Sequence, residues 1–196
     1  MLKQILLNSK RFHIQQKDLP VLIHGDSGIG ASLFSVSLVS DLHKQGLDIF
    51  FLSGYSGARN EFEEQTGAKG VFIDSNFSNA TNIASKKVIF IPSEQPELLV
   101  GLLDRLNDAP ERVIFFKNFE LFEEPIFLRI KSLPNLVLMG NLDKCSYADQ
   151  LVAKNWQTKI FFSASKQISD VKLPPLEKYQ GYLESTAQNG IVSLKQ

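Results

Sequence analysis

The stretch VLIHGDSGIGASLF, residues 21–34, joins three local patterns in one short run. Its first four residues are apolar apart from His24, as in a buried β-strand. Three glycines follow in the turn, and an amphipathic helical pattern begins near Ala31. Glycines let a loop wrap so that its backbone N–H groups point inward, and the next helix adds its positive N-terminal end. The stretch therefore predicts a strand, a loop that can hold an anion, and a helix.

The turn matches a phosphate-binding motif at every defined position but one. Gly25-Asp26-Ser27-Gly28-Ile29-Gly30-Ala31-Ser32 follows the P-loop pattern G-x-x-x-x-G-K-[S/T], with alanine where the lysine belongs. The predicted nucleotide-binding residues are Gly25, Gly28, Ile29, Gly30, Ala31 and Ser32. The hydroxyl of Ser32 lies where such loops place a magnesium ligand, if a nucleotide binds. Without a lysine, this position brings no positive charge to the β and γ phosphates. We expect at most weak binding of ATP or ADP with Mg²⁺, and no fast hydrolysis.

Hydrolysis also needs a carboxylate at the end of a core strand, to hold magnesium and orient water. The segment RVIFFKNFELF, which begins at residue 112, is the candidate by its order in the chain. It has Lys117 and Asn118 where an acidic pair is expected. The remaining acidic candidates are Glu120, two residues further on, and Glu94, which follows the segment VIFIPS. Two motifs thus depart from the catalytic pattern in the same direction, so we assign no catalytic residue.

Apolar strand-like runs alternate with helical runs along the chain. We expect strands at 21–24, 48–53, 71–75, 86–93, 112–118, 135–141 and 159–163, and helices at about 31–44, 58–67, 96–106, 119–132 and 146–155. Near-continuous apolar strands are typical of a parallel sheet with both faces covered, and their alternation with helices indicates an α/β fold.

The sequence patterns at both ends of the chain differ from the alternation of strands and helices in the middle. The segment FHIQQKDLP, residues 12–20, is a candidate for a further strand and turn. At the other end, an extended KLPPLEKY linker precedes GYLESTA and GIVSLKQ, which predict a β-hairpin around Asn189-Gly190. We predict one domain over 1–196, with a core at about 18–165 and a C-terminal extension at 166–196.

Composition narrows the class of function. Lysine plus arginine and aspartate plus glutamate both number 21, so the net charge of zero does not indicate a general hold on nucleic acid. The single cysteine has no partner for a disulfide, and the three histidines show no metal-ligand spacing. No stretch approaches the ~20 apolar residues that span a bilayer. We expect a cytoplasmic protein without membrane insertion that works through a protein partner or as an oligomer.

The order of the elements resembles the RecA-like motor ATPases, especially the branch with conjugative coupling proteins and DNA translocases. In those proteins the phosphate loop opens the domain, a later strand ends in acids, and the next strand ends in a polar sensor. Asn141, at the end of NLVLMGN, lies at the sensor position, and WQTKIFFSAS is similar to the closing strand. The resemblance covers residues 18–165 in pattern and is specific at Gly25, Gly30 and Ser32. It implies a three-layer α/β P-loop NTPase fold with a mostly parallel central sheet.

Two functional hypotheses remain open at this point. The first is a catalytically degenerate P-loop protein that acts as a non-hydrolysing subunit or scaffold of a larger, DNA-related or secretion machine. The alternative is an active RecA-like motor ATPase that carries an engineered Lys-to-Ala substitution in its loop. Lys117 and Asn118 favour the first hypothesis, because an engineered variant would normally keep its acidic strand end.

Overall fold

The computed structural model describes residues 4–26, 28–53, 56–72, 88–92, 112–131, 133–168 and 172–195. Its strands are β1 (Gln4–Leu7), β2 (Lys10–Arg11), β3 (Val21–His24), β4 (Asp48–Ser53), β5 (Val71–Phe72), β6 (Val88–Pro92), β7 (Arg112–Lys117), β8 (Leu136–Gly140), β9 (Thr158–Phe161), β10 (Gln180–Ser185) and β11 (Asn189–Lys195). Its α-helices are α1 (Ala31–Lys44), α2 (Ser56–Thr66), α4 (Glu124–Ile130) and α5 (Ala148–Ala153), with 3₁₀ turns η1 (Gln16–Asp18), η3 (Phe119–Leu121) and η4 (Leu142–Lys144). The helix expected at 96–106 and the candidate Glu94 lie outside the described residues.

The described strands form one sheet in the order β2-β1-β11-β10-β9-β3-β8-β7-β4-β6-β5. Every neighbouring pair from β9 to β5 is parallel. Every pair from β2 to β9 is antiparallel. The expected mostly parallel central sheet is therefore confirmed, and β3 lies within it between β8 and β9.

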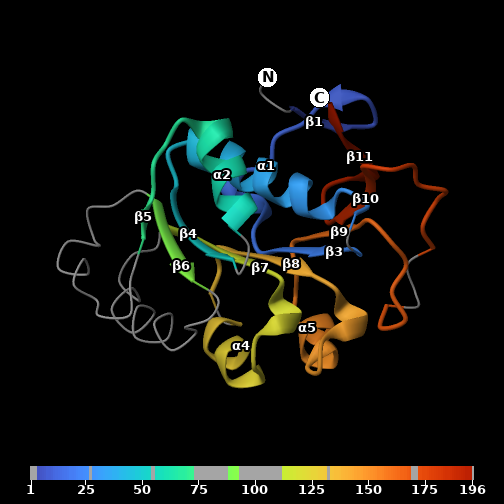
Figure 1. Ribbon diagram of the computed structural model, residues 1–196. Helices are drawn as coiled ribbons and strands as arrows, with labels where there is room; N and C mark the ends of the chain where they lie inside the picture. Colours follow the sequence, from blue (N-terminus) through green and yellow to red (C-terminus); the bar gives the residue numbers. More distant parts are fainter. Residues whose placement is uncertain are drawn as a thin grey trace.

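Helices cover both faces of this sheet and make three layers (Figure 1). Side chains alternate across β3, so Val21 and Ile23 join a core cluster with α1 and α2, while Leu22 joins a second cluster with α4 and α5. Because the strands are buried on both faces, their sequences are almost wholly apolar. The three-layer α/β architecture is that expected from the alternation of runs. No helix among the described residues has the length and apolar character to cross a bilayer.

Helix α1 has the bounds that its sequence predicts. Gly30 is its N-cap with a φ of 106°, and Gly46, with a φ of 97°, follows the C-cap residue Gln45. Positive φ values favour glycine, so both residues mark a helix end in the sequence. The buried face includes Phe34, Leu38 and Leu42.

The C-terminal hairpin is present, but its turn lies earlier than expected. Strands β10 and β11 pair antiparallel, with Glu184 opposite Asn189, so residues 186–188 make the turn and Asn189-Gly190 begins β11. The hydroxyl of Ser185 donates to the Gln188 carbonyl and accepts from the Gln188 N–H, which closes this turn. A serine turn therefore takes the place of the expected Asn-Gly turn.

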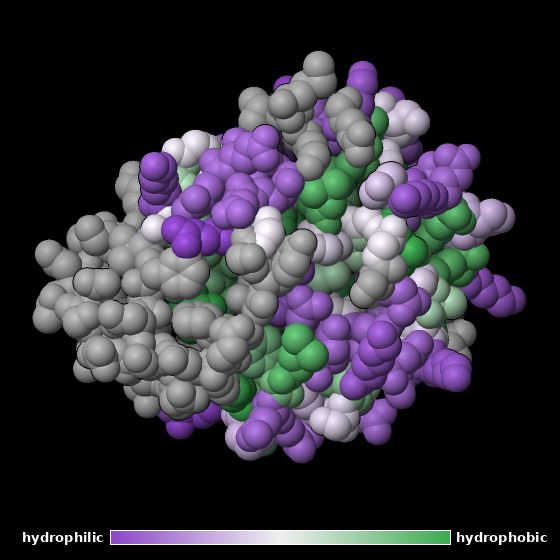
Figure 2. Space-filling model, in the orientation of Figure 1, coloured by the Kyte–Doolittle hydropathy of each residue, from purple (hydrophilic) through white to green (hydrophobic). Residues whose placement is uncertain are grey.

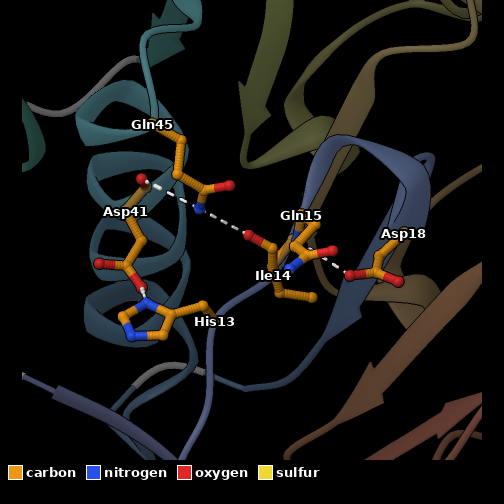
Figure 3. Close-up of polar contacts among 6 residues, drawn as sticks. All are labelled: His13, Ile14, Gln15, Asp18, Asp41 and Gln45. Carbon is orange, nitrogen blue, oxygen red and sulfur yellow. Dashed lines mark hydrogen bonds and ion pairs between the residues drawn. The ribbon is translucent and has the colours of Figure 1, made fainter.

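The N-terminal segment also differs from the expectation. Its strands lie at β1 and β2, before residues 12–20, and that stretch contains only the single turn η1. Ile14 is fully buried there, and Gln45 at the end of α1 donates to its carbonyl at 2.8 Å. His13 lies beside Asp41 of α1, with 2.7 Å between Nδ1 and Oδ2 (Figure 3). The segment is thus bonded to α1, and the carbonyls of Asp18 and Pro20 near its end accept hydrogen bonds from Thr158 of β9.

Candidate functional site

The glycine-rich loop closes tightly between β3 and α1. The Gly25 N–H donates to the Gly140 carbonyl at 3.2 Å, so the loop starts against the end of β8. A Cβ atom at Gly25 would lie 2.8 Å from Cβ of Ala31 and 2.9 Å from Cβ of Phe162. Gly28 has a φ of 84°, which an L side chain seldom adopts. The glycine spacing that suggested a phosphate loop is therefore required by this backbone.

The loop lies at the edge where ligands bind in parallel α/β sheets. His24, the last residue of β3, is in register with Gly140 of β8 and Phe161 of β9. The segments that follow these three strands consequently emerge together at the carboxyl edge of the sheet. Asn141 and Ser163 are among the residues brought there.

Asn141, which the resemblance predicts at the sensor position, contacts the loop directly. Its Nδ2 donates to Oδ1 of Asp26 at 2.6 Å, and its backbone N–H donates to Oε2 of Glu120 at 3.1 Å. Its Oδ1 accepts from the Asp143 N–H at 2.9 Å, which caps η4. Asn141 is only 6% exposed, so these contacts fix its side chain. The structure thus brings two predicted residues, Asn141 and Glu120, together beside Asp26.

The end of β7 has an ammonium group and an amide. Lys117 is 4% exposed, and its Nζ donates to Oδ1 of Asn118 at 3.1 Å. Val113 and Phe115 pack in the cluster with α1, so Lys117, two residues further along β7, is on the same face of the sheet. Burial lowers the pKa of Lys117, while the charge of Glu120 opposes that shift.

Glu120 is built into the same network. Asn118, which has a φ of 61°, directs its Nδ2 toward Oε1 of Glu120 at 3.5 Å. Asparagine tolerates this left-handed conformation better than most residues. A Cβ at position 140 would overlap Oε2 of Glu120, so the glycine there leaves room for the carboxylate. Glu120 therefore lies in η3, bonded to Asn141, and does not begin a regular helix.

The donor atoms at this strand end do not fit magnesium. An ammonium group repels a divalent cation, and an amide oxygen that already accepts from Lys117 is a poor replacement for a carboxylate. Within the described ranges, no group of three or more His, Cys, Asp and Glu residues could hold a metal ion. Ser32 lies in the first turn of α1, and its role as a magnesium ligand stays a prediction.

His24, one of the three histidines without metal-ligand spacing, is buried. The Leu142 N–H donates to its Nδ1 at 3.1 Å, so the ring proton lies on Nε2, which is 3.4 Å from Oγ of Ser163. Desolvation lowers the pKa of His24 more than the neighbouring carbonyl and carboxylates raise it. The neutral ring therefore links the segments after β8 and β9. The feature of the sequence that could have indicated this role is the position of His24 directly before Gly25, where β3 leads into the loop.

Tyr179, the last residue of the segment predicted as an extended linker, contacts the loop. Its N–H donates to the Ile29 carbonyl at 3.0 Å, and its own φ is 67°. A Cβ atom at Gly30 would lie 2.5 Å from Cδ1 of Tyr179. Nothing in the sequence of this tail indicates the contact, because it depends on where the hairpin packs.

Comparison with known proteins shows which solved structures have a similar fold. No family model matches the chain, and no curated protein matches it. The solved structure of VirB4 from Thermoanaerobacter pseudethanolicus is similar, with a TM-score of 0.63 and 7% identity over 90% of this chain and 89% of that one. The fold is that of the RecA-like P-loop ATPases.

Two EssC structures share this RecA-like fold. The cytoplasmic domain of EssC has a TM-score of 0.56 and 11% identity over 100% of this chain. EssC (ATPases 2 and 3) from Geobacillus thermodenitrificans has a TM-score of 0.53 and 13% identity over 92% of it. The present chain spans 42% and 37% of those two chains. At these identities the likeness is one of fold.

Proposed function

We propose that this RecA-like chain is a catalytically degenerate P-loop protein, a non-hydrolysing subunit or scaffold of a larger, DNA-related or secretion machine. The observation that supports the proposal most is the end of β7, where Lys117 is buried and bonded to Asn118. A second departure, Ala31 in the loop, removes the charge expected on the phosphates. The two departures affect separate requirements of phosphoryl transfer.

The residues at the end of β7 determine whether the site could hydrolyse a nucleotide. Transfer of a phosphoryl group needs a metal on its oxygens and a water oriented for in-line attack. Lys117 has no carboxylate oxygen, so it cannot take the place of the acidic group that holds magnesium at this strand end. Glu120 is held by the Asn141 N–H, which makes it a structural partner of the sensor-position residue.

Weak nucleotide binding is part of the proposal. The loop keeps its positive-φ glycines and lies at the N-terminus of the 14-residue helix α1. Backbone N–H groups of residues 28–32 and the positive end of that helix attract phosphate without a lysine. We propose Gly25, Gly28, Ile29, Gly30, Ala31 and Ser32 as the residues in contact with ATP or ADP.

A protein partner in the cytoplasm completes the proposal. A domain without catalysis needs a binding role, and the likeness in fold to EssC and VirB4 agrees with a place in an assembly. Figure 2 shows apolar residues reaching the surface near α4, and Leu121 and Leu128 are 71% and 42% exposed. Exposed apolar side chains of this size are suited to a protein contact.

The substitution Ala31→Lys tests the proposal. We expect ATP affinity to rise about tenfold to a hundredfold, because a charge-assisted contact is worth about 1.5–3 kcal/mol. Isothermal titration should give a wild-type dissociation constant well above micromolar. Ala31→Met is the matched control, since it adds similar length at this buried position without charge.

Turnover separates the two hypotheses. Phosphate release by Ala31→Lys should stay at the background of the wild-type chain, because Lys117 and Asn118 are unchanged. Hydrolysis at an ordinary motor rate would establish the alternative, an active RecA-like ATPase with an engineered loop. Submicromolar ATP binding by the wild-type chain would also contradict the proposal.

A further inference from the structure

The segment before the hairpin holds Tyr179 against the phosphate loop. The Gln180 N–H donates to the Glu177 carbonyl at 3.0 Å, so residues 177–180 make a tight turn with Tyr179 at its third position. A positive φ at that position is typical of a type II turn, which favours glycine or asparagine. An aromatic residue with a φ of 67° persists there only because its surroundings hold it.

The contact has a direct consequence for the loop backbone. A trans peptide is planar, so its carbonyl and its N–H point in opposite directions. The carbonyl of Ile29 accepts from the Tyr179 N–H at 3.0 Å. The N–H of Gly30 belongs to the same peptide and is therefore directed away from Tyr179. Gly30 is also the N-cap of α1, where backbone donors favour anions.

We propose that Tyr179 is a positioning residue for the phosphate loop, whose backbone N–H sets the Ile29–Gly30 peptide so that Gly30 presents its N–H to a bound di- or triphosphate. The inference rests on the proposed function, because it takes the loop as an anion site. It adds to that site a residue outside the motif. Since position 31 has no charge to offer, the orientation of the backbone donors carries more of the binding.

Packing on the other side of the contact agrees with this role. Any side chain at position 30 would meet Tyr179, with a Cβ 2.5 Å from Cδ1 and 2.9 Å from Cα. The loop and the turn therefore fit each other only with glycine at 30. Gln180 is the first residue of β10 and pairs with Ser193 of β11, so the sheet anchors the turn. Coupling between sites is reciprocal, so an anion on the loop should in turn hold the tail more firmly.

The test uses inorganic tripolyphosphate, which has no base that could stack on a tyrosine ring. Amide spectra of the ¹⁵N-labelled full chain follow the titration in the wild type and in Tyr179→Pro. Proline has no N–H and cannot adopt a positive φ, so the bond to Ile29 is lost. We expect the affinity to fall about threefold to tenfold, as for loss of one hydrogen bond.

Two variants serve as matched controls. Tyr179→Phe keeps the N–H and the ring, and Lys178→Pro places proline at the second turn position, where type II turns accept it. Both should bind tripolyphosphate within about twofold of the wild type. In the wild-type chain itself, saturating tripolyphosphate should slow solvent exchange at the Tyr179 amide by a larger factor than at the amides of β11, because general stabilisation by a ligand would slow all of them alike.

The outcomes distinguish this inference from the proposed function. If the wild type binds while Tyr179→Pro binds equally well, or if the ligand slows exchange at Tyr179 no more than at β11, the positioning role is wrong and the anion site stands. If millimolar tripolyphosphate leaves the wild-type amides of residues 28–32 unchanged, the anion-binding part of the proposed function fails, and the role of Tyr179 fails with it.

Discussion

A single buried residue, His24, should make the stability of the protein depend on pH. Its folded pKa is lowered from 6.5 by burial, so between that lower value and 6.5 the unfolded chain binds more protons than the folded one. Stability is then fully present above pH 6.5 and falls as the pH drops through this window, by at most about 1.4 kcal/mol per pH unit. Urea unfolding from pH 7.5 to 5 measures the effect.

The variant His24→Asn isolates this contribution, because its amide oxygen can still accept from the Leu142 N–H but does not titrate. We expect a shallower fall of stability below pH 6.5 than in the wild type. Parallel curves for the two proteins would show that His24 is not responsible.

Individual residues also show where sequence reasoning succeeded. The glycines of the loop were readable because each is required by the local backbone. The bond from Asn141 to Asp26 joins residues 115 positions apart, and the resemblance suggested a sensor role for Asn141 but not this contact. Tyr179 left no signal, because its importance comes from a carbonyl on a different element.

At the scale of elements, three contacts that involve the N-terminal segment or α1 should contribute unequally to the free energy of unfolding. Ile14→Ala should lower the free energy of unfolding by about 2–5 kcal/mol, because it empties a fully buried site. Gln45→Ala should cost about 1 kcal/mol through the lost bond to the Ile14 carbonyl. His13→Ala should cost less than about 1 kcal/mol, because its contact with Asp41 is solvent-exposed. Chemical denaturation of the three variants checks the order, and a His13 effect as large as that of Ile14 would contradict it.

Element bounds could be predicted where the chain itself marks them. Helix α1 begins after one positive-φ glycine and ends before another, and β3 and β4 have the predicted limits. The strands β1 and β2 were missed because they are short and because β1 pairs with β11 at the opposite end of the chain. Long-range pairing of this kind leaves little local pattern.

For the molecule as a whole, the sheet has a parallel part and an antiparallel part that share β9. In the antiparallel part, β1 from the start of the sequence pairs with β11 from its end. The parallel part follows from alternating apolar runs, whereas the antiparallel part depends on docking of both ends. The division into a core at 18–165 and an extension stays a prediction.

Truncation after residue 168 tests that division. It removes β10 and β11, which leaves an edge of β9 unpaired and takes from β1 its partner β11. We expect a less cooperative thermal transition and a tendency to associate, because an exposed edge strand pairs with other chains. Leu183→Ala, at a buried hairpin position, is the milder comparison and should still unfold cooperatively. A truncated chain that melts like the full one would make the hairpin dispensable.

The pairing of β1 with β11 has an engineering consequence. Gln4 lies opposite Lys195 in an antiparallel ladder, so the Cα atoms of these two residues are about 5 Å apart. A short linker can therefore close the chain into a ring, and new ends can be opened in a surface turn such as residues 186–188. For the same reason the domain can be inserted into a loop of a host protein. The host chain would enter at Gln4 and leave at Lys195, which lie side by side, so the insertion need not separate the two ends of the host loop.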